Sequence, residues 1–343
     1  MRTSKKISII FVISLIVIIS IFKSPYYEYK GFIFNTYYDI RIRSFKEGQG
    51  LSHKIETVLE DINRTMSVFR SDSELSKLNQ TPMYKEFELS TDLAKVLKKS
   101  QEINKLSYGY FDPSISPLID LWGFGKKTPS PILPSEEQIS EVLKYSKFSG
   151  LIFSDDFQSV IKTDSRMELN LSAIAKGFAV DKIAELLEEE GFNDYIVEIG
   201  GEVRTSGYRN RSGTGWYVGI GVPHPDKLSN AIVLELSNMS VATSGDYRNF
   251  IEKEGIRYSH TISPVEGKPV QNKLASVSVF APTCMEADAY ATAIMSMGED
   301  KGLQFANDNL LAVILFIHTQ KDKFKTVLSS QAKKILGDQY ETD

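Results

Sequence analysis

The chain has 343 residues, of which 42% are hydrophobic and 24% charged, a composition typical of a globular protein with one large domain or two small ones. Residues 1–23 hold four basic residues and no acidic one, so the remainder carries a net charge of −8. Because nucleic-acid binding needs a basic surface, this charge argues against a nucleic-acid partner. The one cysteine, Cys284, excludes an intramolecular disulfide.

The first residues predict a membrane segment. Basic residues precede a charge-free apolar run from Ile7 to Phe22, and no small-residue cleavage site follows it. We expect an uncleaved signal-anchor over residues 1–24, with a cleaved signal peptide as the alternative. Since basic flanks stay in the cytoplasm, residues 25–343 are expected on the extracytoplasmic side of the bacterial cytoplasmic membrane. A lipoprotein is excluded, because lipidation needs a cysteine just after the apolar run and the only cysteine is Cys284.

The first half of the exported part mixes strand and helix patterns. Residues 29–43 interleave aromatic and β-branched residues with polar ones, which favours a strand or hairpin. Apolar residues at helical spacing predict amphipathic helices over residues 51–68 and 91–106. A hairpin is expected over residues 151–162, followed by a helix over residues 174–190.

The second half is richer in strands. Strand-like runs separated by turn residues cover residues 195–199, 216–222, 231–236, 275–280 and 310–318. Strands and helices are mixed without a regular βαβ rhythm. We therefore expect an α+β fold, with one domain over residues 25–343 and a mixed, largely antiparallel sheet packed by helices.

A helix is also predicted over residues 284–293, which include Ala, Met and Glu. Asp288 and Thr292 are four residues apart, so the carboxylate and the hydroxyl lie on one helix face. Their oxygen atoms suit a hard cation such as Mg²⁺, which keeps room for phosphate oxygens. Alone, such a pair is more often a solvated face or a local hydrogen bond.

A second segment supports a cation-binding role for this pair. Residues 170–177 are typical of a loop that enters a helix with Lys176 in its first turn. Helix starts bind phosphate groups, because their backbone N–H groups have no partner within the helix. A cation-binding helix and a phosphate-ready helix start together indicate a metal-assisted reaction on a phosphorylated cofactor.

Other motifs fail. The stretch Gly123–Thr128 is no phosphate loop, since Asp120 stands where that motif needs a glycine. The sequence has no H-E-x-x-H or C-x-x-C zinc signature. Of the four histidines, only His260 is a candidate catalytic residue, because it stands where a strand is expected to meet a turn.

Nine stretches, in order, resemble the ApbE-type FAD:protein FMN transferases, and together they span nearly the whole exported part. They are FNTY (34–37), FRSDSEL (69–75), YFDPS (110–114), LWGFG (121–125), LSAIAKGFAVD (171–181), EIGGE (198–202), SGDYRN (244–249), HTISP (260–264) and EADAYAT (286–292). One stretch would be unpersuasive, but nine in family order are highly specific.

The resemblance implies a Mg²⁺ ion bound by the backbone carbonyl of Ala173, the Asp288 carboxylate and the Thr292 hydroxyl. The FAD contacts that it implies are Phe34, Phe69, Tyr110, Phe111, Asp112, Asn170, Lys176 and Ile262. These residue types agree with that role, because aromatic rings suit a flavin or adenine face and a lysine suits a pyrophosphate.

The chain departs from the family pattern at three places. Asn170 stands where many members have Asp, which removes a charge near the cofactor. Phe34-Asn35-Thr36 replaces the commoner Met-Gly-Thr, and Glu198 stands where an amide or small residue is frequent.

The implied activity is Mg²⁺-dependent transfer of FMN from FAD to a Thr or Ser hydroxyl of a partner protein, with release of AMP. His260 would act as base or orienting group for the attacking hydroxyl. We expect the acceptor to be an extracytoplasmic or membrane redox protein. Three alternatives stay open: FAD hydrolysis to FMN and AMP, a flavin-binding protein without turnover, and a structural envelope protein.

Overall fold

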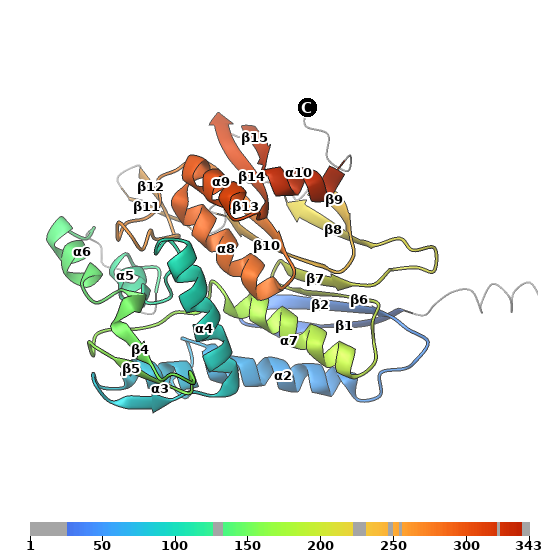
Figure 1. The fold of residues 1–343 in the computed structure, drawn as a ribbon, viewed down its shortest axis with the longest axis horizontal. Helices are drawn as coiled ribbons and strands as arrows, with labels where there is room; N and C mark the ends of the chain where they lie inside the picture. Colours follow the sequence, from blue (N-terminus) through green and yellow to red (C-terminus); the bar gives the residue numbers. More distant parts are fainter. Residues whose placement is uncertain are drawn as a thin grey trace, which may run out of the picture.

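An eight-stranded antiparallel sheet forms the centre of the molecule (Figure 1). The computed structural model describes residues 26–125, 133–221, 231–245, 250–253, 256–320 and 323–337. The strand order is β1-β2-β6-β7-β10-β13-β14-β15, and each neighbouring pair is antiparallel. The strands are β1 (Tyr26–Ile33), β2 (Thr36–Arg43), β6 (Tyr195–Ile199), β7 (Glu202–Ser206), β10 (Met239–Gly245), β13 (Leu274–Ala281), β14 (Ala312–Gln320) and β15 (Lys323–Leu328).

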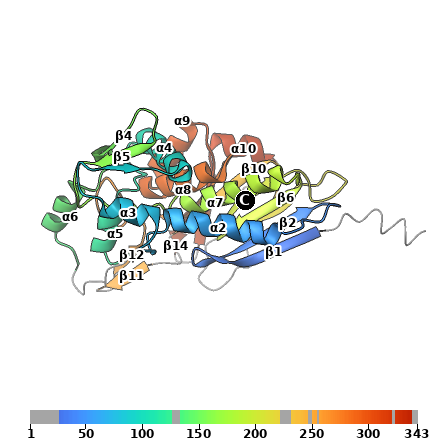
Figure 2. The same cartoon turned by 90° about the horizontal axis from the view of Figure 1, so that it is seen from below.

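Helices cover one face of this sheet. Helix α7 (Ala175–Glu189) packs on β6 and β7, and α8 (Cys284–Met297) packs on β10 and β13. Helix α4 (Thr91–Leu106) contacts α8, while α9 (Glu299–Asp308) lies between α8 and β14. Helix α2 (Leu51–Met66) lies against α7 and along the β1 edge of the sheet, as Figure 2 shows from below. Helices α7 and α8 therefore lie side by side over the middle of the sheet.

The core follows from the alternation of side chains along the strands. Ile40 of β2 and Val197 of β6 are buried against the helices. Strand β13 is buried over its whole length, because helices cover one face of it and further elements cover the other. These elements are the hairpin of β8 (Trp216–Gly221) with β9 (Ala231–Leu236), and helix α10 (Ser330–Leu336).

The remaining elements lie mostly beyond one end of the sheet, at the left in Figure 1. They are α3 (Glu74–Gln80), β3 (Glu86–Glu88), α5 (Ser116–Leu121), α6 (Glu136–Leu143), the 3₁₀ turn η1 (Phe148–Gly150), β4 (Leu151–Phe153), β5 (Ser159–Lys162), β11 (Phe250–Lys253) and β12 (Ile256–Ser259). The buried ammonium of Lys162 donates hydrogen bonds to the carbonyls of Asn79 and Met167, at 2.6 and 3.1 Å. These bonds fasten β5 to the end of α3 and to the chain that leads into the helix start at residue 175.

The expected α+β fold with a largely antiparallel sheet is confirmed. Each of the predicted strands and helices that the structure describes is present, with bounds that differ by a few residues at most. Strands β3, β7, β10, β11 and β15 were not anticipated, although β7 and β10 complete the middle of the sheet. The sequences of β7 and β10 are rich in polar and small residues and lack the apolar alternation that predicts a strand.

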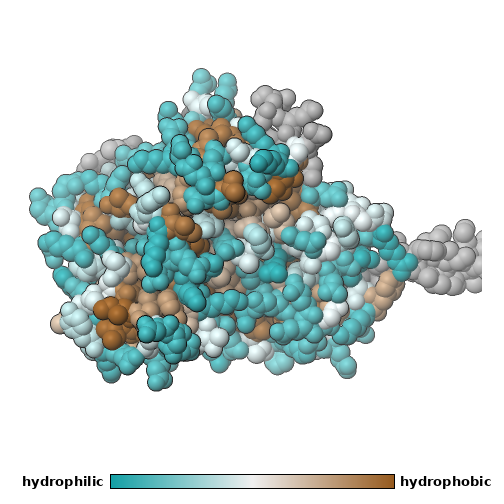
Figure 3. All heavy atoms as spheres, viewed as in Figure 1, coloured by the Kyte–Doolittle hydropathy of each residue, from teal (hydrophilic) through white to brown (hydrophobic). Residues whose placement is uncertain are grey.

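The expected signal-anchor over residues 1–24 lies outside the described residues. Among the residues that the structure describes, no helix is both long and apolar enough to cross a membrane. Figure 3 shows a surface that is mostly hydrophilic on this face, with hydrophobic residues in small separate areas.

Candidate active site

Two neighbouring cavities collect every residue that the sequence predicts for the site. The first, of about 360 Å³, is lined by Tyr110, Phe111, Asp112, Asn170, Ala173, Lys176, His260, Ile262, Asp288 and Thr292, among others. The second, of about 600 Å³, is lined by Phe34, Phe69 and Lys176. Both cavities include Ser172 and Lys176 in their walls, so they meet at the start of α7.

Helices α7 and α8 touch backbone to backbone at this point. A Cβ atom added to Gly177 would lie 2.3 Å from the carbonyl oxygen of Cys284, so only a glycine permits the contact. The N–H of Gly177 donates a hydrogen bond to Oδ2 of Asp288, at 3.0 Å. The close approach therefore delivers the buried Asp288 carboxylate to the first turn of α7.

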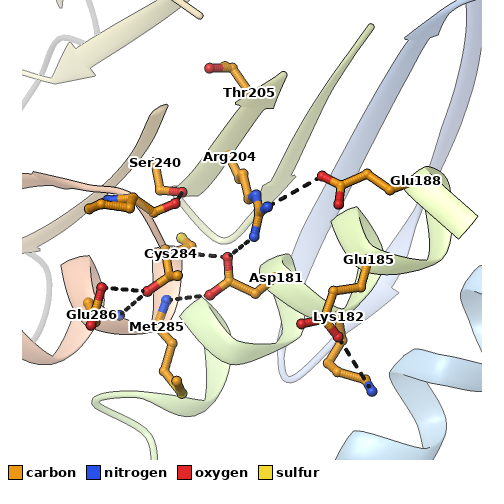
Figure 4. Close-up of polar contacts among 12 residues, drawn as sticks. Asp181, Lys182, Glu185, Glu188, Arg204, Thr205, Ser240, Cys284, Met285 and Glu286 are labelled. Carbon is orange, nitrogen blue, oxygen red and sulfur yellow. Dashed lines mark hydrogen bonds and ion pairs between the residues drawn. The ribbon is translucent and has the colours of Figure 1, made fainter. Parts of the chain in front are cut away.

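A second carboxylate fixes the same pair of helices (Figure 4). Asp181 of α7 accepts the N–H groups of Cys284 and Met285, both at 2.9 Å, at the N-terminus of α8. Arg204 of β7 donates to Asp181 at 2.9 Å and lies 3.3 Å from Glu188. A carboxylate at a helix N-terminus satisfies N–H groups that have no partner within the helix. Asp181 and Arg204 thus join α7, α8 and β7 into one frame.

Three charged groups meet beside the junction of the cavities. Nζ of Lys176 lies 2.9 Å from Oε1 of Glu202 and 3.9 Å from Oδ1 of Asp288. Glu202 and Asp288 are only 4% and 3% exposed. Oε2 of Glu202 is buried and has no hydrogen-bond partner among the described residues.

Burial and pairing set the protonation of these groups. Burial raises the pKa of Glu202 to about 7, although the Lys176 charge acts against it. Burial also raises the pKa of Asp288, opposed by Lys176 and by the Gly177 N–H. Burial alone would lower the pKa of Lys176, but the attraction of Asp288 and Glu202 outweighs it and raises that pKa above its usual value. Lys176 therefore stays a cation in the site.

The oxygen atoms near Asp288 fit a hard divalent cation. Oγ1 of Thr292 lies one helical turn beyond Asp288 and 3.3 Å from Oγ of Ser244. Ala173 lies in the turn before α7 and lines the same cavity. The described part of the chain has no cluster of three His, Cys, Asp or Glu side chains that could hold a metal ion. A set of one carboxylate, one hydroxyl and one carbonyl is of a different kind, and its chemistry suits Mg²⁺.

The predicted cofactor residues differ in how they meet the cavity. Phe111 is 2% exposed and belongs to the core, whereas Phe69 is 77% exposed beside the second cavity. The Asp112 carboxylate accepts the N–H groups of Ser114 and Phe148, at 2.8 and 3.0 Å. Burial raises the pKa of Asp112 against these hydrogen bonds. Asp112 therefore shapes the cavity wall by holding neighbouring backbone.

Residues 34–36, where the sequence departs from the family pattern, lie at a tight turn with a left-handed backbone. Phe34 and Asn35 form the two-residue turn between β1 and β2, and both have positive φ, 52° and 59°. Such turns favour Asn or Gly, and a bulky residue in this region is strained. The strained turn places Phe34 at the second cavity.

His260 directly follows β12 and begins a loop that is closed by hydrogen bonds between its backbone groups. The N–H of Val270 donates to the Thr261 carbonyl, and the N–H of Ser263 donates to the Lys268 carbonyl, at 2.9 and 2.8 Å. These bonds hold His260 and Ile262 in the wall of the first cavity. Of the stretch SGDYRN, residues 246–249 lie outside the described residues.

Glu202 is the site residue that sequence reasoning missed. It stands in the stretch EIGGE, directly after the turn in which Gly200 and Gly201 have φ values of 67° and 104°. The local sequence showed a tight turn, but it could not show that β7 starts under the first turn of α7. The roles predicted for the other residues stay predictions, although the structure brings them together.

Comparison with known proteins identifies similar chains. Residues 34–315 match the model of the ApbE family. An FAD:protein FMN transferase of Vibrio cholerae serotype O1 is 38% identical over 291 residues, which cover 85% of this chain and 86% of the relative. An FAD:protein FMN transferase of Haemophilus influenzae is 40% identical over 286 residues, 82% of each chain.

Solved structures of flavin transferases also resemble this chain. The flavin transferase ApbE from Vibrio cholerae superposes with a TM-score of 0.83 at 34% identity, covering 91% of this chain and 99% of that one. The apo form of the Pseudomonas stutzeri flavinyl transferase ApbE also gives 0.83, at 29% identity, covering 91% of this chain and 97% of that one.

Proposed function

Because this chain belongs to the ApbE family, we propose that it is an FAD:protein FMN transferase that modifies a Thr or Ser hydroxyl of a partner protein. Mg²⁺ is the proposed cofactor and AMP the proposed leaving product. The observation that carries the proposal is the pair of joined cavities, with Lys176 at their junction and the buried Asp288 carboxylate beside it.

The cavities suit an elongated dinucleotide. Their volumes, about 360 and 600 Å³, lie in the range of small-molecule sites. In the proposed complex the pyrophosphate lies near Lys176, and the flanking rings of FAD extend into the two cavities. Aromatic side chains such as Phe34 and Tyr110 supply apolar faces for these rings.

The proposed cation site consists of the Ala173 carbonyl, the Asp288 carboxylate and the Thr292 hydroxyl. Mg²⁺ bound there would act as a Lewis acid for negative charge on phosphate oxygens. Lys176 would add a second positive charge close by, which favours the charge distribution of phosphoryl transfer.

In the proposed reaction the acceptor hydroxyl attacks the phosphorus on the FMN side of FAD. A new O–P bond forms, and the bond from that phosphorus to the bridging oxygen breaks. AMP leaves with the bridging oxygen, and the acceptor keeps FMN through a phosphodiester. His260 is the proposed base or orienting group for the hydroxyl proton.

We also propose that the enzyme works outside the cytoplasmic membrane, held by a signal-anchor over residues 1–24. The support is the basic, then apolar, N-terminal sequence. An acceptor on the same side of the membrane, such as an extracytoplasmic or membrane redox protein, fits this location.

Intact mass spectrometry tests the proposal. The protein is incubated with FAD, MgCl₂ and the acceptor protein of the Vibrio cholerae relative, and each chain is weighed. A gain of one FMN on the acceptor, with one AMP released, supports transfer. Rapid free FMN and AMP with an unmodified acceptor would instead identify a hydrolase. Unchanged FAD that stays bound to the protein would identify a flavin-binding protein.

A further inference from the structure

We propose that Glu202 is a positioning residue for the cation site: by holding the Lys176 ammonium, it keeps Oδ1 of Asp288 open to a divalent cation. The inference deepens the proposed function, because the cation is the one that would assist transfer. It concerns the chain's own charges and can be tested by metal binding alone.

The geometry of the three groups carries the inference. Lys176 donates a hydrogen bond to Glu202 at 2.9 Å, but it stands 3.9 Å from Oδ1 of Asp288, too far for a hydrogen bond. The other Asp288 oxygen, Oδ2, is already occupied by the Gly177 N–H. Oδ1 is thus the Asp288 oxygen that approaches the ammonium, on a side chain that lines the first cavity.

Burial explains why Lys176 stays with Glu202. The Glu202 carboxylate is 4% exposed, and its Oε2 has no hydrogen-bond partner in the described part of the chain. A buried carboxylate without a compensating cation costs several kcal/mol. The Lys176 ammonium supplies that compensation, so Glu202 competes with Asp288 for the same cation.

The contacts of β7 hold Glu202 in its position. Glu202 is the first residue of β7, paired with Ile199 of β6, and its Oε2 lies close to Gly200. Arg204, two residues along the strand, is tied to Asp181 of α7. Since β7 and α7 are fixed together, the carboxylate and the ammonium keep their spacing.

Neutralising Glu202 should release Lys176 toward Asp288. Glu202→Gln keeps the side-chain shape and an oxygen that can accept from Nζ, but it removes the charge that balances the pull of Asp288. The ammonium would then neutralise Asp288 and compete with a divalent cation for Oδ1. Loss of the nearby negative charge also weakens cation binding directly, so the two effects must be separated.

A double-mutant cycle separates them. Mn²⁺, which accepts the same oxygen ligands as Mg²⁺, is titrated into the ligand-free protein at about pH 8, where the Glu202 carboxyl is mostly ionised, and the unbound ion is measured by electron paramagnetic resonance. The variants are Glu202→Gln, Lys176→Met and the double variant. Glu198→Gln, on the neighbouring strand β6 at an exposed position, is the matched control.

We expect Glu202→Gln to weaken Mn²⁺ binding at least tenfold, and Lys176→Met to strengthen it. In the Lys176→Met background, Glu202→Gln should weaken binding about threefold or less, because the competing ammonium is gone. Glu198→Gln should leave the affinity within about twofold of wild type.

An equal effect of Glu202→Gln in both backgrounds would overturn the inference, and so would wild-type affinity in Glu202→Gln. Failure of the wild-type protein to bind Mn²⁺ would overturn it together with the cation site. Wild-type protein that binds Mn²⁺ but does not flavinylate the acceptor would refute the proposed transfer alone. The two failures are therefore distinguishable.

Discussion

The Asp288 carboxylate of α8 accepts the backbone N–H of Gly177 of α7, at 3.0 Å, in the only place where a bare glycine lets the backbones of these described helices meet. The hydrogen bond orients one carboxylate oxygen and leaves the other toward Lys176. The geometry of the candidate cation site therefore depends on a helix contact as much as on the ligands themselves.

The first prediction tests that contact. Gly177→Ala places a methyl group 2.3 Å from the Cys284 carbonyl, so the helices must separate. We expect a loss of about 1–3 kcal/mol in the free energy of unfolding, typical of overpacking, and loss of FAD binding. Urea denaturation and flavin fluorescence measure the two effects. Gly221→Ala is the control, because a Cβ there meets no atom within 4 Å, and it should change neither quantity.

A second prediction concerns the proposed metal ligands. Asp288 is the one formally charged group among them, so Asp288→Ala should abolish transfer and weaken Mg²⁺ binding. Thr292→Val keeps the shape but loses the oxygen, and it should weaken both less. Single-turnover kinetics and titration calorimetry provide the measurements. Asp288→Ala activity within about tenfold of wild type, or roughly 1.4 kcal/mol of barrier, would refute the metal assignment.

The third prediction is a pH dependence of stability. Burial raises the pKa of Glu202 from 4.5 to about 7 in the folded, ligand-free protein. The folded state therefore holds a proton that the unfolded state loses, and its contribution is full below pH 4.5 and disappears as pH rises through 7. The free energy of unfolding of wild type should fall over this range relative to Glu202→Gln. A difference in the free energy of unfolding between the two proteins that stays constant over this pH range would contradict the raised pKa.

His260 is the subject of the fourth prediction. His260→Asn should lower the transfer rate at saturating FAD while the dissociation constant for FAD changes little, because a proton-transfer or orienting role is expressed in the transition state. Rapid-mixing transfer assays and fluorescence titration separate the two. If the variant instead loses FAD affinity and keeps its rate at saturation, His260 is a cofactor contact.

The fifth prediction concerns the N-terminus. Strand β1 begins at Tyr26, so deletion of residues 1–24 removes no described element. The shortened protein should be soluble and as active on FAD as the full chain, whereas the full chain should fractionate with membranes. Aggregation of the shortened protein would show that the apolar run is part of the folded domain.

Sequence patterns predicted the parts of the site that are local. The spacing of Asp288 and Thr292 placed both on one face of α8, and the loop before Lys176 was found before α7 as expected. The contact at Gly177 was not predictable, because it joins helices that are distant in the sequence. Glu202 was missed for the same reason: its role depends on β7 lying under α7, a register that no local pattern specifies.

The site draws its residues from positions 34 to 292, on elements that are distant in the sequence and neighbours in the fold. The proposed FAD site therefore exists only in the completed fold, and the binding energy of FAD would add to the stability of the whole chain. Added FAD should slow proteolysis even at loops far from the cavities. Bound flavin would then mark the protein molecules whose folding is complete.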